Sequence, residues 1–239
     1  LSRWNVSQVE DFSKMFRRAS SFNQSLENWN TSKAKNMNAL FENAVSFNHP
    51  INKWNVENVT HMGYLFKNAR NFNQPLSNWN TENVINVESM FCNALEFNQS
   101  IGNWNVSNVE FMNFMFEGTQ KFDQDLNKWN TEKVVSMKGM FKNSIFNGNL
   151  IEWNTENVVN MVSMFENATH FVGGVKYWDM RKVRATSRMF LGAIEFNENI
   201  STWKSTEVRP DNDRSLNLKF YTNPTKETWD SETGKKIII

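Results

Sequence analysis

The chain has 239 residues and a formal net charge of +1, from 26 basic and 25 acidic residues. A charge this close to zero provides no field to hold a polyanion, so nucleic acid is not expected as a partner. Aromatic residues make up 14% of the chain while Gly (9) and Pro (4) are scarce, which predicts a folded protein with a large apolar core. A single cysteine excludes an intramolecular disulfide, and no apolar run is long enough to form a transmembrane segment.

From its first residues onward, the sequence repeats with a period of 25 residues. Two phenylalanine rows share the period of the tryptophans, and their spacing places a one-residue deletion between Phe141 and Phe146. Units of this length cannot bury their own apolar face and must stack on their neighbours. The sequence therefore predicts a solenoid of about eight to nine repeats over residues 1–203. Its tryptophans are Trp4, Trp29, Trp54, Trp79, Trp104, Trp129, Trp153, Trp178 and Trp203.

Each repeat is expected to contain one amphipathic helix of roughly ten residues. In the third repeat, the spacing of five apolar residues is typical of the inner face of such a helix: Val59, Met62, Leu65, Phe66 and Ala69. An Asn or Asp after nearly every Trp suits a helix N-cap or the turn that leads to it. After the apolar stripe come residues that tolerate the left-handed conformation at a helix end, namely Asn43, Asn68, Asn93, Gly118, Asn143, Asn167 and Gly192.

The rest of each unit, such as residues 72–79, is too short for a second helix and predicts a short strand. Strands of neighbouring repeats would lie about 4.8 Å apart and form a parallel sheet on one face. The predicted fold class is therefore α/β, a leucine-rich-repeat-like solenoid with one strand and one helix per repeat. A row of Asn at the coil corner is interpreted as a ladder that pairs backbone groups, in preference to a ligand site: Asn23, Asn48, Asn73, Asn98, Asn147 and Asn197.

The repeat motif resembles a known family. The unit Phe-Asn-Gln-Pro-Leu-Ser-Asn-Trp-Asn-Thr-Glu-Asn-Val, followed by Met-Phe-x-Asn-Ala, is similar to the BspA-like leucine-rich-repeat family of bacterial surface proteins. That family is abundant among mycoplasma lipoproteins and occurs also in some other bacteria, protists and giant viruses. The resemblance covers about residues 1–203. It implies a right-handed α/β solenoid displayed at a surface, with adhesion or protein binding as the usual assignment, and it supplies no catalytic residues.

Residues 204–239 depart from the repeat and are expected to form a C-terminal cap or a linker. Pro210 would end the ninth unit, and residues 216–221 predict a strand. A repeat array needs a cap over its last apolar face, which favours that role for this segment. Because residue 1 already lies inside a repeat, any signal peptide, lipid anchor or N-terminal cap would have to precede it.

The sequence offers no constellation of residues that would support catalysis. It lacks a nucleophile with a nearby base and a phosphate-binding Gly-rich loop, so neither an enzyme nor a cofactor is expected. His49, His61 and His170 occupy different positions of different repeats, which argues against a zinc site. Cys92 stands where another repeat carries Glu42, so it is expected near the surface.

The candidate partner-binding residues are those that vary between repeats. One row runs along the presumed sheet just before each Trp, with Tyr177 as its best anchor, and contains Arg3, Lys53, Lys128, Glu152 and Tyr177. A second candidate is a basic cluster on one face of the eighth helix, formed by Arg181, Arg184 and Arg188. A solvated surface without a partner is the alternative for both.

Together these features favour a non-catalytic module for protein–protein interaction or adhesion, at a cell surface or outside the cell. Its partner would be a protein of a host surface, of the extracellular matrix or of a neighbouring assembly. The alternative is a structural component of a larger assembly, such as a giant-virus particle or a surface layer, because the ends and sides of a solenoid can be covered by neighbours.

Overall fold

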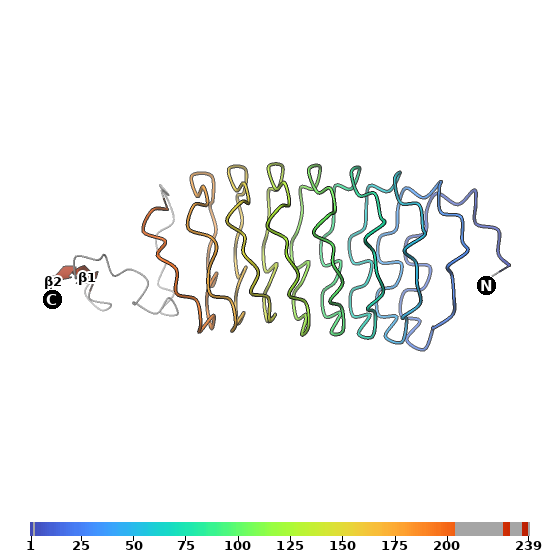
Figure 1. The fold of residues 1–239 in the computed structure, drawn as a ribbon, viewed down its shortest axis with the longest axis horizontal. Coiled ribbons are helices and arrows are strands. Elements are labelled where there is room, and N and C mark those ends of the chain that lie inside the picture. The colour runs from blue at the N-terminus through green and yellow to red at the C-terminus, as the bar shows by residue number, and fades with distance from the viewer. Residues whose placement is uncertain (2, 204–226, 230–235, 239) are drawn as a thin grey trace.

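The chain forms a stack of similar coils, one for each 25-residue unit. The computed structural model describes residues 1, 3–203, 227–229 and 236–238. Within residues 3–203, the coils lie side by side along the long axis of the molecule (Figure 1). Each coil contacts the next through an isolated parallel bridge, from Asp11 opposite Asn36 to Asn160 opposite Ala185. Residues one repeat apart in the sequence are therefore neighbours in space.

The predicted α/β fold is wrong, because no helix forms among the described residues and no sheet runs along the stack. In an α-helix each N–H would bond a carbonyl four residues earlier in the same segment. Here the N–H groups of Met37, Ala39 and Phe41 donate instead to the next coil, to the carbonyls of His61, Gly63 and Leu65 at 2.8–3.0 Å. The segments expected to be strands, such as residues 72–79, form none, and the single bridge residues lie instead in the segments expected to be helices.

The helix-like spacing of the apolar residues comes from consecutive β-turns. The N–H of Leu40 donates to the carbonyl of Met37, that of Ala44 to Phe41, and that of Phe47 to Ala44, at 2.9–3.2 Å. Each turn advances the chain by three residues and brings the next apolar side chain back inside. All five of these side chains have no exposed surface. The predicted core residues are thus confirmed, although their backbone conformation is not.

The left-handed conformation expected at the end of each apolar stripe is confirmed. All seven predicted residues have positive φ, between 56° and 61° for the five Asn and at 70° and 75° for the two Gly. A second left-handed row lies four residues earlier and was not predicted, because it contains Ala39, Tyr64 and Phe114 as well as Gly139. Side chains of this kind disfavour positive φ, so the bonds to both neighbouring coils must hold the backbone there.

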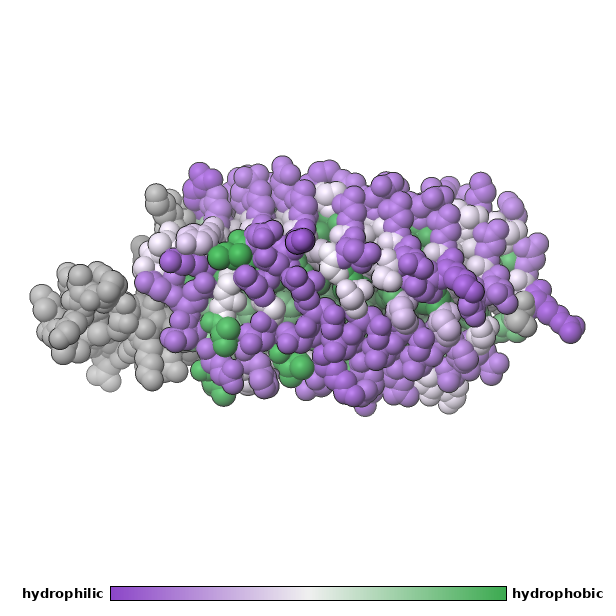
Figure 2. All heavy atoms as spheres, viewed as in Figure 1, coloured by the Kyte–Doolittle hydropathy of each residue, from purple (hydrophilic) through white to green (hydrophobic). Residues whose placement is uncertain are grey.

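Three aromatic rows fill the core. Within one coil, Phe66 and Phe72 stack with ring centroids 3.9 Å apart. Between coils, Trp79 lies 6.2 Å from Trp104, and the indole N–H of Trp104 donates to the carbonyl of Leu76 at 3.1 Å. The large rings therefore bury apolar surface and also join each coil to the one before it. The surface in Figure 2 is mostly hydrophilic, as expected when these rings lie inside.

The deletion predicted in the sixth coil leaves this core unchanged. Phe141 and Phe146 stack at 4.1 Å, which matches the corresponding pairs of the complete coils. At the shortened corner, the hydroxyl of Ser144 donates to the carbonyl of Phe141 at 2.7 Å. The missing residue is thus absorbed at the corner between the two rings.

The corner row of Asn is confirmed as a backbone-pairing ladder. The Oδ1 atom of Asn73 accepts from the N–H of Asn98 at 3.0 Å, and the N–H of Asn73 donates to Asn48 in the same way. Asp123 continues the row. Val172 carries no amide and ends the row. The carboxylate of Glu198, one coil later, accepts instead from the backbone N–H groups of Gly174 and Val175, which follow Val172 in the chain.

We expect Asn73→Ala to lower the free energy of unfolding by about 1 kcal/mol, because the N–H of Asn98 loses its acceptor. Asn78→Ala, in an exposed turn of the same coil, should change it by less than about 0.5 kcal/mol. Urea unfolding of both variants measures the difference. Equal stabilities would contradict the role assigned to the ladder.

Two strands lie outside the stack. β1 (Glu227–Trp229) pairs antiparallel with β2 (Lys236–Ile238), with Thr228 opposite Ile237. The predicted strand at residues 216–221 and the predicted break at Pro210 lie outside the described residues.

Candidate binding surfaces

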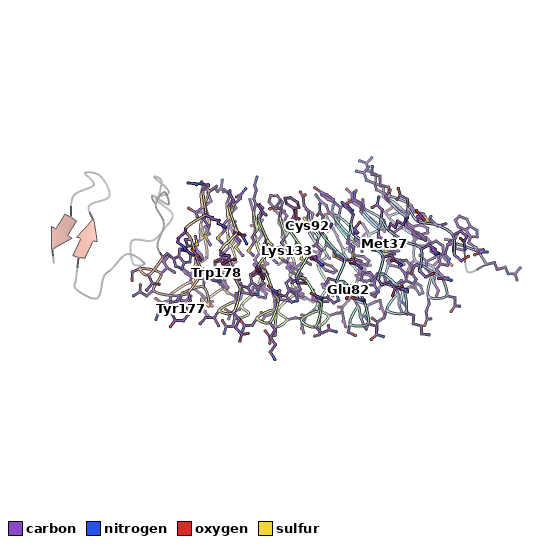
Figure 3. The ribbon with its side chains drawn as sticks, turned by 90° about the horizontal axis from the view of Figure 1, so that it is seen from above. Met37, Glu82, Cys92, Lys133, Tyr177 and Trp178 are labelled. Atoms are coloured by element: carbon purple, nitrogen blue, oxygen red, sulfur yellow. The ribbon has the colours of Figure 1, made fainter. Side chains whose placement is uncertain are left out.

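The residues predicted to bind a partner beside the tryptophans lie in exposed turns and not on a sheet. Each turn is closed by the N–H of the Trp, as from Trp54 to the carbonyl of Ile51 at 3.0 Å. Tyr177 is 67% exposed while Trp178 is buried, and Figure 3 shows Tyr177 at the margin of the stack. We call this set the turn row: Arg3, Lys53, Lys128, Glu152 and Tyr177. Its predicted location on a sheet is wrong, because these positions lie in turns.

Neighbouring charges accompany two members of the turn row. The ammonium of Lys53 pairs with Glu27 at 2.7 Å, in a position too exposed for the pair to stabilise the fold much. The ammonium of Lys176 lies 5.4 Å from the ring centroid of Tyr177. The row therefore presents an accessible aromatic ring beside a cation, a combination suited to a contact with another protein.

The three arginines predicted to share a helix face do not do so, because that helix is absent. The guanidinium of Arg181 donates to the carboxylate of Asp179, and this hydrogen bond lowers the pKa of Asp179. The backbone N–H of Arg184 donates to Val159 in the preceding coil at 2.8 Å. Arg188 has a left-handed backbone, with φ 60°, and its guanidinium donates to Glu166. Arg181 and Arg188 are thus engaged with acidic side chains, and the predicted basic face of a helix is wrong.

Glu166 is a buried carboxylate that the sequence analysis missed. Its side chain is 3% exposed, and the ammonium of Lys142 lies 3.2 Å away. Burial raises the pKa of Glu166, but a hydrogen bond from Ser163 and the charges of Lys142 and Arg188 outweigh burial and hold the pKa below its ordinary value. The alternation of charge along this row of the repeat could have indicated the site: Arg17, Glu42, Lys67, Cys92, Glu117, Lys142 and Glu166.

Cys92 belongs to the same row and is buried, so its predicted place near the surface is wrong. The thiol lies 3.6 Å from the carboxylate of Glu117. Burial, with the nearby charge of Glu117, raises the pKa of Cys92 to about 12. The thiol therefore stays protonated at neutral pH, which makes it a poor nucleophile.

A shallow groove of about 460 Å³ runs across the third to sixth coils and was not predicted. We call it the amide groove. Its residues are the fourth and sixth after successive tryptophans: Asn58, Thr60, Asn83, Ile85, Asn108, Glu110 and Lys133. Further along the stack, a hollow of about 300 Å³ is lined by the third and fourth residues after Trp153 and Trp178, namely Glu156, Arg181 and Lys182. The Asn at the fourth position was a visible signal in the sequence.

Two other kinds of site are absent from the described part of the chain. Residues 1, 3–203, 227–229 and 236–238 bring no three His, Cys, Asp or Glu side chains together in a way that could hold a metal ion. None of these residues forms a helix long and apolar enough to cross a membrane.

Comparison with known proteins agrees with the repeat. A family model described as "Mycoplasma protein of unknown function, DUF285" matches residues 1–101, 74–145 and 137–229. No curated protein and no solved structure matches the chain. The match does not extend to the leucine-rich-repeat type or to a lipoprotein anchor. Because the three matches together cover most of the sequence, the chain belongs to the DUF285 family, a repeat family with BspA-like members.

Proposed function

We propose that this chain is a non-catalytic binding module displayed at a surface, which contacts protein partners through the turn row. The framework of the stack uses the same positions in every coil, for aromatic packing and for hydrogen bonds between coils. The side chains of the turn row vary from coil to coil and take no part in that framework. Such variation on a rigid support is typical of repeat proteins that bind a partner along one side.

The observation that carries the proposal is the exposure of Tyr177. Its ring is 67% exposed at the tip of a tight turn, although the family motif keeps nearly all other aromatic residues inside. An exposed Tyr held by a rigid turn loses little conformational entropy on binding, and Tyr is enriched among residues that dominate interface energies. Lys53 and Lys128 would then contribute charge to the same edge.

The triple variant Lys53→Ala, Lys128→Ala, Tyr177→Ala is expected to weaken binding to extracellular-matrix protein at least tenfold. Biolayer interferometry on an immobilised matrix preparation and on intact host cells measures this. The matched control replaces the neutral residues at the same position of other coils, Asn28, Asn78 and Asn103, by Ala, and should bind as the natural chain does. Unchanged binding by the first variant would refute the site.

A structural role in a larger assembly is the second candidate. It is favoured by apolar side chains exposed along the sides of the stack, such as Phe111, Val172 and Ile194 at 37%, 48% and 76% exposure. A neighbouring molecule of an assembly would bury these side chains. Surface labelling of source cells or particles, with copy numbers from mass spectrometry, separates the candidates. Variable copy number with an exposed turn row supports the binding module, whereas fixed stoichiometry with protected sides supports the assembly.

A further inference from the structure

We propose that the amide groove binds a neutral carbohydrate chain that lies along the axis of the stack. This site is distinct from the turn row, because it uses the fourth and sixth residues after each Trp. The proposal rests on four properties of the groove: the fixed orientation of its amides, its balance of charge, the pairing of its backbone, and its aliphatic side chains.

The amides of the groove are held in one orientation. The Nδ2 atoms of Asn58 and Asn83 donate to the preceding coil, to the carbonyls of Ser32 at 3.0 Å and Glu57 at 2.7 Å. Asn108 does the same, and its Oδ1 accepts from the ammonium of Lys133 at 2.6 Å. One N–H of each amide is thus used inside the stack, while the oxygens of Asn58 and Asn83 are left to meet a ligand. A ligand that offers hydrogen-bond donors at an interval of one coil can pair with these oxygens.

The charge of the groove favours an uncharged ligand. Glu110 and Lys133 carry opposite charges, and the other five lining side chains are neutral. A phosphate or sulfate chain would meet the carboxylate of Glu110 as well as the ammonium, without a net field to hold it. Glu110 and Lys133 instead provide one strong acceptor and one strong donor, both of which hydroxyl groups can satisfy.

An extended peptide fits the groove poorly. Peptides that add to a sheet need unpaired N–H and C=O groups at an edge. Here the backbone along the groove is already paired between coils, from Thr60 to Lys35, from Ile85 to Thr60 and from Glu110 to Ile85, at 2.9–3.0 Å. An extended peptide along the axis would also repeat every ~6.6–6.8 Å, whereas stacked chains repeat at about 4.8 Å, so its donors would fall out of step with the amides.

A chain of sugar rings meets these requirements. Its hydroxyl groups donate to the amide oxygens, and the length of an extended pyranose unit is close to the spacing of the coils. The apolar faces of the rings can pack on the aliphatic side chains of the sixth position, which include Ile85 and, beyond the groove, Val135 and Val159 at 36% and 38% exposure. Figure 3 shows Lys133 within the run of coils, away from the first and last of them, where such a chain has coils on both sides.

The test is isothermal titration calorimetry of the whole chain with cellohexaose, chitohexaose and mannohexaose as neutral probes. Heparin and an extended neutral peptide serve as discriminating probes. We expect at least one neutral hexasaccharide to bind, and we expect Asn83→Ala and Glu110→Gln each to weaken that binding tenfold or more. Asn78→Ala, in the exposed turn of the same coil as Asn83, should leave it unchanged. Glu110→Gln keeps the size of the side chain, so it tests the site even if Asn83→Ala perturbs the coil.

Binding of heparin or of the peptide, without any hexasaccharide, would overturn the proposal. So would the absence of all hexasaccharide binding, or binding that survives both groove variants. The turn-row triple variant separates this result from the proposed function. Loss of matrix binding with intact hexasaccharide binding supports two independent sites, and loss of hexasaccharide binding in that variant would also contradict the groove.

Discussion

Trp129→Ala is expected to lower the free energy of unfolding by about 3–5 kcal/mol, the largest effect among the substitutions considered. Trp129 is buried in the middle of the stack and lies 6.2 Å from Trp153. Its indole N–H donates to the carbonyl of Ile101 at 3.1 Å. The substitution therefore removes packing on both sides, leaves a cavity and removes one of the two hydrogen bonds that the carbonyl of Ile101 accepts, since the N–H of Trp104 donates to it as well.

Trp4→Ala is the matched control, because Trp4 holds the same position in the first coil but is 57% exposed. It stacks on Trp29 alone, with centroids 6.4 Å apart. We expect it to change stability by less than about 1 kcal/mol. Thermal and urea unfolding of both variants measure the difference. Similar losses for Trp4 and Trp129 would contradict a core built by stacking coil on coil.

Glu166→Gln is expected to cost about 1–2 kcal/mol, because Lys142 and Arg188 then face each other without the carboxylate between them. The effect falls below that of a fully buried ion pair, since the side chains of Lys142 and Arg188 are 27% and 54% exposed. Glu96→Gln is the control, because Glu96 pairs with Lys121 where both side chains are half exposed. We expect it to cost less than about 0.5 kcal/mol.

The contribution of Glu166 should also depend on pH. The folded protein holds the pKa of this carboxyl below its ordinary value of 4.5, so the charged form is favoured by folding. The stabilisation is then present above pH 4.5 and is lost as the pH falls through the lower pKa of the folded state. The difference in stability between the natural chain and Glu166→Gln should accordingly shrink below pH 4.5. A difference that stays constant down to pH 3 would contradict the ion pair.

The sequence was sufficient to predict which residues form the core, because apolar burial depends on spacing alone. Val59, Met62 and Phe66 are buried as expected, and so are the rows of Trp and Phe apart from Trp4, Phe22 and Trp203. The role of the Asn row also followed from elementary requirements, since a corner that lacks regular structure must pair its backbone groups. Both predictions concern side chains that recur in most coils.

The helix could not be distinguished from consecutive turns, because both return a side chain to the same face after three or four residues. A helix and consecutive turns differ in which carbonyl groups accept from the backbone N–H groups. The spacing of apolar residues carries no information about these acceptors. A local signal was nevertheless present. Tyr64 and Phe114 stand at left-handed positions, where an interior helix residue would not lie, and Gly139 occupies the same position three coils after Tyr64 and one coil after Phe114.

The candidate sites were predicted less well than the core. The turn row was placed on exposed residues, but its setting was mistaken because it was tied to the expected sheet. Cys92 was misplaced because its charged counterparts, such as Glu42 and Lys67, suggested an exposed row. The amide groove was missed because no role was assigned to the Asn that recurs at the fourth position after Trp. In Asn83 the Nδ2 atom has a structural role, while the oxygen of the same amide does not.

The direction of the hydrogen bonds between coils has a mechanical consequence. Bonds such as those from Phe66 to Met90 and from Phe91 to Met115, and the indole bonds of the tryptophans, run from one coil to the next. A pulling force along the stack loads all the bonds of a junction together, so they share the load instead of breaking in succession. Once a junction fails, one coil of 25 residues is released, which lengthens the chain by at most about 80–90 Å. The stack would thus behave under tension as a series of equal extensible links.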